Sequence, residues 1–446
     1  MSEPAAPPKP RAAPSWLSPT RLHRQALLLT IALWLGYVLN MSAPGMRDRF
    51  GHLKGADFLH SYILGTLALN HLGNALYDPR IQRDMGAARV PGSAGDYFLP
   101  VYPPHYSLFW MPFAKLPYPW AAAMWIALSA LIYAACCYAI WRSCPHLRSD
   151  GVTVALLAAA FPGFYELINF GQNSSLALAC FTGMYFALRA RRDFLAGLCL
   201  GLLAFKPQLA LVSACVILFD CFWPRSMALD RLHHEAARLQ KAWKILLGAI
   251  LTLAAQIGAV WLWYGSGPLL IYARLLPHLA SAARILEPKP YLMHSLRAFW
   301  DLLLPWPHVA LALYIPTAVA ATVLTIVCWH PSIPLEHRFS ILLLATVLVA
   351  PHLTVYDLVI LAPAFLWIAE ACIAKICIAK TSVADSVQPG AGSTPAIPTI
   401  AWLLYLSYIL PFAGPLSQWT HLQLSVICLS ALLVIFSEKV RREVEV

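Results

Sequence analysis

The sequence predicts an all-α polytopic membrane protein with about twelve transmembrane helices and with interfacial helices in its first outer loop. Three observations lead to this fold class: 59% of the 446 residues are hydrophobic, only 12% are charged, and the mean hydropathy is +0.63. A soluble domain usually carries about twice that share of charged residues, so much of the surface must face lipid. The formal charge of +11 comes from short basic clusters between apolar runs, so we expect no nucleic-acid partner.

The first 24 residues are basic and rich in Pro and Ala, which predicts a disordered cytoplasmic tail. The apolar run from about Ala26 to Ala43 is too long and too far from the start for an ordinary signal peptide, and it lacks a convincing cleavage site. We therefore expect it to be a retained first span. Further spans are expected at 118–141, 152–170, 173–189, 194–223, 244–264, 308–330, 339–351, 358–377, 399–413 and 420–437.

The run 194–223 is expected to break in its middle. Pro207 lacks a backbone donor and disfavours helix at Lys206, and a lysine within hydrocarbon is costly. This run therefore predicts two short helices that meet at Lys206. The expected boundaries are 1–24 for the tail, 25–378 for the transmembrane module with 45–117 as its first outer loop, 379–398 for a Pro/Gly/Ser linker, 399–437 for a terminal hairpin and 438–446 for a second cytoplasmic tail.

An amphipathic run opens at Asp57 and continues to Asp78. At helical spacing its polar and apolar residues fall on opposite sides, which is typical of a helix lying in the membrane interface. A carboxylate at a helix start is also favoured by the helix dipole, so a purely structural role for Asp57 stays open at this point. The expected polar side contains Asp57, His60, Ser61, His71 and Asn74.

The charges predict the orientation of the chain. With a cytoplasmic N-terminus, most of the 32 Lys and Arg fall in inner segments, as the positive-inside rule requires, and both termini are cytoplasmic. This threading gathers six polar segments on the outer face, where they predict a cavity between membrane and water. The segments are Asp57, Tyr97–Pro104, Gly171–Asn173, Lys206–Gln208, Met293–Ser295 and His352–Asp357.

In order and spacing these segments resemble glycosyltransferase family 87 over roughly residues 25 to 375. The motifs are Ala56-Asp57-Phe58, Ala75–Asp78, Tyr102-Pro103-Pro104 followed by Phe109–Pro112, Gly171-Gln172-Asn173, Gly197–Lys206-Pro207-Gln208 and Pro351-His352 with Tyr356-Asp357. The resemblance implies a GT-C-like integral membrane enzyme, facing the periplasm or cell exterior from the inner or plasma membrane. It would transfer a hexose, with mannose as first candidate, from a polyprenyl-phosphate sugar to a lipid or glycan acceptor, inverting, without cofactor or metal. The alternative function is a transporter or flippase of lipid-linked sugars.

The resemblance implies roles for single residues. Asp57 would be the general base on the acceptor hydroxyl, with Asp78 and Asp96 as other carboxylates in the same loop. Lys206, His352 and Arg297 would bind the donor phosphate, followed by Arg47, Arg49, Arg274 and Arg284. The substrate cavity would be lined by His60, Tyr102, Gln172, Asn173, Gln208, His294, Tyr356 and Asp357.

Three of these segments also have structural interpretations. Lys206 resembles a snorkelling lysine at a span end. Gly171–Asn173 is equally typical of a tight turn between spans, and Tyr102-Pro103-Pro104 of a rigid start to a helix. Met293-His294-Ser295 departs from the polar triplet that the family has at this place, so its role stays open.

Overall fold

The computed structural model describes residues 18–93, 101–223, 232–279, 289–385 and 396–445. Within these ranges the regular secondary structure consists of helices, without a β-strand. Six of them are long and apolar enough to cross a membrane, or seven if the pair Arg148–Ala159 and Pro162–Phe170, bent by 48°, forms one span. The all-α membrane class is therefore confirmed. The finer count of about twelve crossings, which includes shorter apolar helices, stays a prediction.

The helices follow the predicted spans closely. The first half of the chain contains α1 (Pro19–Met41), α2 (Ala56–Leu69), η2 (Gly73–Tyr77), α3 (Pro79–Arg89), α4 (His105–Phe109), α5 (Met111–Ala114), α6 (Tyr118–Arg142), η3 (Arg148–Asp150), α7 (Gly151–Ala159), α8 (Pro162–Phe170), α9 (Ser174–Arg189), α10 (Asp193–Leu202), η4 (Leu203–Phe205) and α11 (Pro207–Phe222). The second half contains α12 (Leu232–Tyr264), α13 (Gly267–Leu279), η6 (Pro290–Leu292), α15 (Leu296–Leu303), α16 (Pro307–Cys328), α17 (Leu335–Val349), η7 (Val355–Leu361), α18 (Ala362–Asp385), α19 (Ala396–Ile409), η8 (Leu410–Leu416), α20 (Ser417–Thr420) and α21 (Leu424–Glu445).

Several boundaries differ from the prediction at the ends of spans. Helix α1 begins at Pro19, so the last residues of the expected tail are helical, and proline is well suited to a first helical position. Helix α18 continues into the expected linker as far as Asp385, and α21 continues through the expected C-terminal tail to Glu445. In α21 the ion pair between Glu438 and Arg442, one turn apart, supports this extension. Residues 1–17 and 386–395 lie outside the described ranges.

The expected interfacial helix from Asp57 to Asp78 is wrong in two respects. Helix α2 ends at Leu69, His71 has a left-handed backbone with φ 54°, and η2 follows as a separate turn. All residues from Phe58 to Ala68 are buried, including the polar ones. Helices α4 and α5 pack on α2, and Gly65 allows this approach, because a Cβ there would lie 2.5 Å from the Trp110 carbonyl oxygen. Protein, rather than water or lipid headgroups, therefore covers the polar side of α2.

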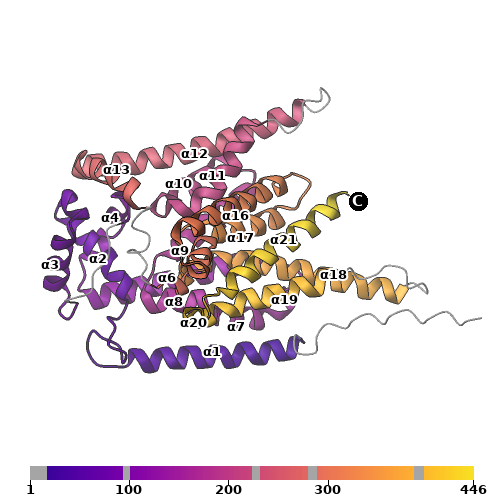
Figure 1. The fold of residues 1–446 in the computed structure, drawn as a ribbon, viewed down its shortest axis with the longest axis horizontal. Helices are drawn as coiled ribbons and strands as arrows, with labels where there is room; N and C mark the ends of the chain where they lie inside the picture. The colour runs from indigo at the N-terminus through magenta and orange to yellow at the C-terminus, as the bar shows by residue number, and fades with distance from the viewer. Residues whose placement is uncertain (1–17, 94–100, 224–231, 280–288, 386–395, 446) are drawn as a thin grey trace, which may run out of the picture.

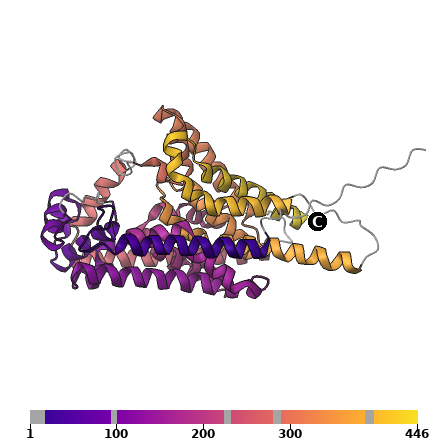
Figure 2. The ribbon, with the colours of Figure 1, turned by 90° about the horizontal axis from the view of Figure 1, so that it is seen from below.

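The first outer loop and the end of α12 lie at the same end of the molecule. Figure 1 shows α2, α3, α4 and α13 together there, whereas the start of α1 and the C-terminus lie at the opposite end. Trp263 Nε1 donates to the Ala68 carbonyl at 2.9 Å, and the Tyr264 hydroxyl lies 2.7 Å from Ser107 Oγ. Helix α1 runs along the lower side of the bundle in Figure 1, and it lies across the face turned to the viewer in Figure 2. The threading expected from the charges requires this same grouping of loops.

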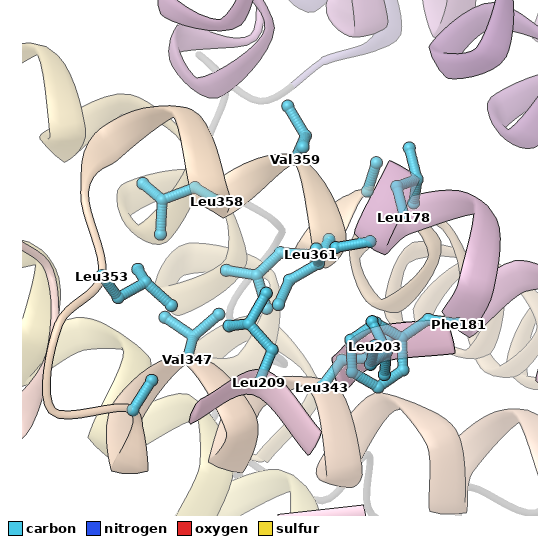
Figure 3. Packing of buried hydrophobic residues seen from close by; sticks show 14 of the residues in the cluster. Leu178, Phe181, Leu203, Leu209, Leu343, Val347, Leu353, Leu358, Val359 and Leu361 are labelled. Carbon is cyan, nitrogen blue, oxygen red and sulfur yellow. The ribbon is translucent and has the colours of Figure 1, made fainter. Parts of the chain in front are cut away.

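The predicted break at Lys206 is confirmed. The short turn η4 ends at Phe205, and α11 begins at Pro207. Buried hydrophobic side chains on both sides of the break pack with α9, α17 and η7 (Figure 3). This packing fixes the positions at which the polar segments emerge from their helices. The labelled members are Leu178, Phe181, Leu203, Leu209, Leu343, Val347, Leu353, Leu358, Val359 and Leu361.

The close contact of α10 with α12 gives a test of the fold. A Cβ on Gly197 would lie 1.9 Å from the Ile245 carbonyl oxygen, so the two backbones meet through this glycine. We expect Gly197→Ala to lower the melting temperature and the yield of monodisperse protein, as measured in detergent by size-exclusion chromatography after heating. Gly258→Ala on α12 is the control, because no atom lies within 4 Å of the added Cβ; an unchanged melting temperature for Gly197→Ala would contradict the packing.

Candidate functional site

Asp57 and Gln172 meet where α2 begins and α8 ends. Gln172 Nε2 donates to Asp57 Oδ2 at 2.6 Å. Two glycines with left-handed backbones make this contact possible: Gly55 precedes α2 with φ 66°, and Gly171 ends α8 with φ 67°. A side chain at 171 would press on Phe58, whose Cβ would lie 3.0 Å away. The Gly-Gln-Asn segment is therefore a tight turn, and it also delivers an amide to the carboxylate.

The surroundings of Asp57 raise its pKa to about 6. Burial is the largest cause, the hydrogen bond from Gln172 and the positive charge of Lys206 lower the pKa, and the negative charge of Asp357 raises it. By its accessible surface the residue as a whole is only partly buried. A carboxylate with a pKa near 6 is mostly ionised at neutral pH and is still basic enough to accept a proton from a bound hydroxyl.

Asn173 joins this turn to the first outer loop. Its Nδ2 donates to the Tyr106 hydroxyl at 2.6 Å and to the Tyr102 hydroxyl at 3.0 Å, and the two tyrosine rings stack with centroids 4.1 Å apart. Ser61 Oγ lies 2.6 Å from the Tyr106 hydroxyl. The Asn173 Oδ1 atom is buried and has no protein partner. This oxygen can accept a hydrogen bond from a ligand hydroxyl.

Lys206 forms a buried ion pair with Asp357. Its Nζ donates to Asp357 Oδ1 at 2.6 Å and to Ser174 Oγ at 3.0 Å, and Ser174 Oγ itself donates to Asp357 Oδ1 at 2.5 Å. The two charged side chains are 5% and 3% exposed, so Lys206 is not a snorkelling lysine. The Tyr356 ring lies 5.4 Å from Nζ. The positive charge at the helix break is therefore largely offset by protein before any ligand binds.

His352 lies in the turn before η7, beside this pair. Its Nδ1 is buried and has no protein partner. Burial lowers the pKa of His352, the charge of Asp357 raises it, and the charge of Lys206 lowers it. The imidazole is therefore mostly neutral at pH 7, with one ring nitrogen available to a ligand.

His294 is buried behind the same turn. Its backbone N–H donates to the Leu353 carbonyl at 2.9 Å, and Met293 pairs with Thr354 as an antiparallel bridge. His294 Nδ1 lies 2.7 Å from Ser425 Oγ, the residue is 1% exposed, and burial lowers its pKa to about 3. His294 is therefore a neutral link between segments rather than a cation in an open cavity.

The other expected site residues divide into two groups. His60 is buried with its ring centroid 5.7 Å from that of Tyr102, and burial lowers its pKa to about 4, so it belongs to this cluster. Arg297 instead pairs with Asp301 at 2.7 Å and lies over the ring of Tyr314. Gln208 is partly exposed in the first turn of α11 and takes no part in the network of Asn173 and Lys206.

The remaining carboxylate and arginine candidates either stabilise loops or lie away from the Asp57 and Lys206 contacts. Asp78 caps α3, since its Oδ1 accepts from the Arg80 amide at 2.8 Å. Arg47 and Arg49 donate to backbone carbonyls of the first outer loop and of α1. Arg274 is exposed on α13, and Asp96 and Arg284 lie outside the described residues.

Sequence reasoning missed Tyr106 and Ser174, which carry much of the network. It gave no site role to Ser61, expected on the polar side of the first amphipathic run, or to Thr354, within the segment His352–Asp357. Tyr106 lies four residues after Tyr102, and Ser174 follows the Gly-Gln-Asn turn at a helix start, so both positions had a local signal. Glu166 is a further ionisable residue within an apolar span, where such residues usually mark function. Across the described ranges, no group of three or more His, Cys, Asp or Glu side chains is arranged to hold a metal ion.

An apolar groove of about 620 Å³ lies between α1, α6 and α8. Its walls include Trp34 and Tyr37 of α1 and Phe164 of α8, and small residues of α6 such as Ala127 leave it open. Gly55, two residues before Asp57 in the chain, is also among the lining residues. The shape and apolar lining of the groove suit a hydrocarbon chain.

Comparison with known proteins gives one match. The model of glycosyltransferase family 87 matches residues 98–351, which is more than half of the chain. No curated protein and no solved structure matches. The matched range contains Tyr102, Gln172 and Lys206, whereas Asp57 precedes it and Asp357 follows it.

The buried ion pair can be tested by stability. Lys206→Met leaves Asp357 as an uncompensated buried charge, which costs about 3–5 kcal/mol in comparable cases. We expect a marked fall in melting temperature, largely restored by the double variant Lys206→Met/Asp357→Asn. Lys241→Met is the control, because Lys241 is 44% exposed and 3.7 Å from Asp193, and such pairs contribute less than about 1 kcal/mol. Equal effects at the two lysines would show that the Lys206 pair is not structurally important.

Proposed function

The chain belongs to glycosyltransferase family 87 and is a membrane glycosyltransferase, and we propose that it uses a polyprenyl-phosphate sugar as donor. The sugar is a hexose, with mannose as first candidate, and the acceptor is a lipid or a glycan. One observation carries this proposal. The turn after α8 joins the two charged groups, because Gln172 donates to Asp57 and Ser174, two residues further on, contacts both Lys206 and Asp357. The pKa of Asp57 in this setting is about 6.

In the proposed reaction Asp57 is the general base. Gln172 occupies its Oδ2 atom, so Oδ1 accepts the proton of the acceptor hydroxyl. The hydroxyl oxygen attacks the anomeric carbon and forms the new glycosidic bond, while the bond from that carbon to the phosphate oxygen breaks. The polyprenyl phosphate leaves with the electron pair, and the configuration inverts because attack and departure occur on opposite faces of the sugar.

His352 is the proposed contact to the leaving phosphate. Its buried Nδ1 has no protein partner, whereas the charge of Lys206 is already paired with Asp357. An arriving phosphate favours the protonated imidazole, so the histidine gains charge as the ligand binds. The Lys206–Asp357 pair then supplies a fixed dipole beneath it. Arg297 is left out of this site, because Asp301 and Tyr314 engage its guanidinium.

The proposed active site faces the periplasm or cell exterior. Two observations support this orientation: most Lys and Arg fall in the segments assigned to the cytoplasm, and α2–α4 lie at the opposite end of the molecule from the C-terminus (Figure 1). Both termini would then be cytoplasmic. Lipid-linked donors displayed on the outer leaflet could reach the site without crossing the membrane.

The base role of Asp57 is tested by Asp57→Asn, which keeps the size of the side chain but cannot accept the proton. Turnover should fall by about 100-fold or more, measured as transfer of label from polyprenyl-phosphate mannose into membrane lipid and glycan. The variant should be as stable to heat at pH 7–8 as the wild type, or more stable. Because folding raises the pKa of Asp57, ionisation of this side chain makes the wild-type protein less stable as the pH rises through about 6, and asparagine does not ionise. Near wild-type turnover would exclude this role.

The wild-type pH profile supplies the companion measurement. Since the ionised form is the base, kcat/KM should rise with pH up to about 6 and then level off. Gln172→Leu removes a hydrogen bond that lowers the pKa of Asp57, so its profile should shift to higher pH. A profile that is flat between pH 5 and 8 would contradict the assignment.

We further propose that the groove beside Gly55 holds the hydrocarbon chain of a lipid substrate. Ala127→Trp should fill it and raise the KM for that substrate. Losing the burial of two methylenes, at about 0.8 kcal/mol each, corresponds to about a tenfold rise. A raised donor KM identifies the prenyl chain, and a raised acceptor KM identifies the acceptor lipid. Leu128→Trp on the next face of α6, 38% exposed, is the control; unchanged KM values for Ala127→Trp would reject the proposal.

A further inference from the structure

The C-terminal hairpin, from α19 to α21, follows the residues that the family model matches and yet reaches the candidate site. Gln423 lies directly before α21, and both its side-chain nitrogen and its side-chain oxygen form hydrogen bonds. Its Nε2 donates to the Tyr291 carbonyl at 2.8 Å and to the Met293 carbonyl at 2.7 Å, while its Oε1 accepts from Ser417 Oγ at 2.8 Å. The residue is 1% exposed. A buried amide with every contact satisfied in this way fixes the segment it binds.

Ser425, two residues further on, contacts the same segment from the first turn of α21. Its Oγ lies 2.7 Å from His294 Nδ1, and both residues are 1% exposed. Turn η8 also approaches closely, because a Cβ on Gly414 would lie 3.2 Å from the Tyr291 carbonyl oxygen. The hairpin therefore holds residues 291–294 through side-chain hydrogen bonds and through close backbone packing.

Residues 293–294 in turn hold the segment that carries His352 and Asp357. The His294 amide donates to the Leu353 carbonyl at 2.9 Å, and Met293 pairs with Thr354. The Thr354 amide and hydroxyl both donate to Asp357 Oδ2 at 3.4 Å, and Asp357 Oδ1 accepts from Lys206. A continuous series of contacts thus runs from α21 to the buried ion pair.

We propose that Gln423 and Ser425 are positioning residues of the donor-phosphate site, which they hold in place through His294 and the turn 352–357. The inference rests on the proposed function in one respect, namely that this turn binds the donor phosphate. The hairpin is then part of the catalytic unit. Its contribution is to fix where the free nitrogen of His352 points, and a shift of about 1 Å at such a position is costly for function.

The experiment compares two serines on one helix. Ser425→Ala removes the hydroxyl that contacts His294, and Gln423→Leu removes the amide at similar size. Ser437→Ala is the matched control, because Ser437 is equally buried on α21 and lies about 18 Å further along the helix. Ser425→Thr keeps a hydroxyl and is the rescue variant. Each full-length protein is measured by hydrogen–deuterium exchange and by kinetics with undecaprenyl-phosphate mannose.

For Ser425→Ala and Gln423→Leu we expect faster exchange of the His294 amide and of peptides covering 352–357. The donor KM should rise about tenfold, as expected for the loss of one or two buried hydrogen bonds, with kcat changed less than about twofold. Ser437→Ala and Ser425→Thr should match wild type in both measurements.

Two results would overturn the inference. Unchanged exchange at His294 and at 352–357 in both variants would show that the hairpin does not hold the turn. A fall in melting temperature and kcat with an unchanged donor KM would show that the two residues stabilise the fold in general and do not position the donor-phosphate site. If the wild-type protein transfers no sugar from any polyprenyl-phosphate donor, the proposed function fails, while the exchange data still decide whether the hairpin positions the turn.

Discussion

The buried pair of Lys206 and Asp357 is the interaction on which the polar interior depends. Three interruptions of helical structure meet at it: the start of α9 at Ser174, the break before Pro207, and the turn that opens η7. In a membrane protein, irregular backbone is tolerated only where protein buries it or where it borders a cavity. Lys206, Asp357 and the Ser174 hydroxyl therefore hold together three helix ends whose exposed backbone groups would be unfavourable in contact with lipid.

Asp57 has a different environment from Asp357, although each lies at the start of a helical segment. Asp357 receives a cation, a serine hydroxyl and the capping groups of Thr354, all directed at its two oxygens. Asp57 receives one amide and keeps part of its surface exposed. Asp357 is thus held by several contacts, whereas the described hydrogen bonds of the Asp57 side chain engage only its Oδ2 atom. Paired carboxylates in unlike surroundings are a common basis for dividing roles between them.

Much of the fold could be predicted from the sequence because each signal was local. Hydrophobic length gave the long spans, and Pro207 after a lysine gave the break. The α2 interpretation failed because amphipathic spacing does not reveal what covers the polar side, where Tyr102 lies against His60 and Tyr106 of α4 contacts Ser61. The ion pair of Arg297 with Asp301 had a simple local signal, because Asp301 follows by four residues and that spacing favours a pair on a helix.

The residues around the candidate base were only partly predictable. Gln172 and Asn173 are predicted site residues because the threading places their turn on the outer face and because the turn is one of the motifs that resemble the family. The contacts of Ser61 with Tyr106, and of Ser174 with Asp357, join positions 45 and 183 residues apart. No periodic pattern within one helix contains such information. The family match establishes membership, but it leaves both carboxylates outside its range. The contacts of Asp57 with Gln172, and of Asp357 with Lys206, are therefore seen only in the three-dimensional structure.

The position of the groove at the edge of the bundle affects how substrate supply should be described. Helix α1 forms one wall, and little of its apolar stretch is buried by the rest of the protein, so this wall faces the bilayer. A chain that enters beside it arrives by lateral diffusion in two dimensions. The relevant concentration is then the mole fraction of that lipid in the leaflet, and diluting the enzyme with detergent or inert lipid will slow it even when the molar amount of substrate is constant.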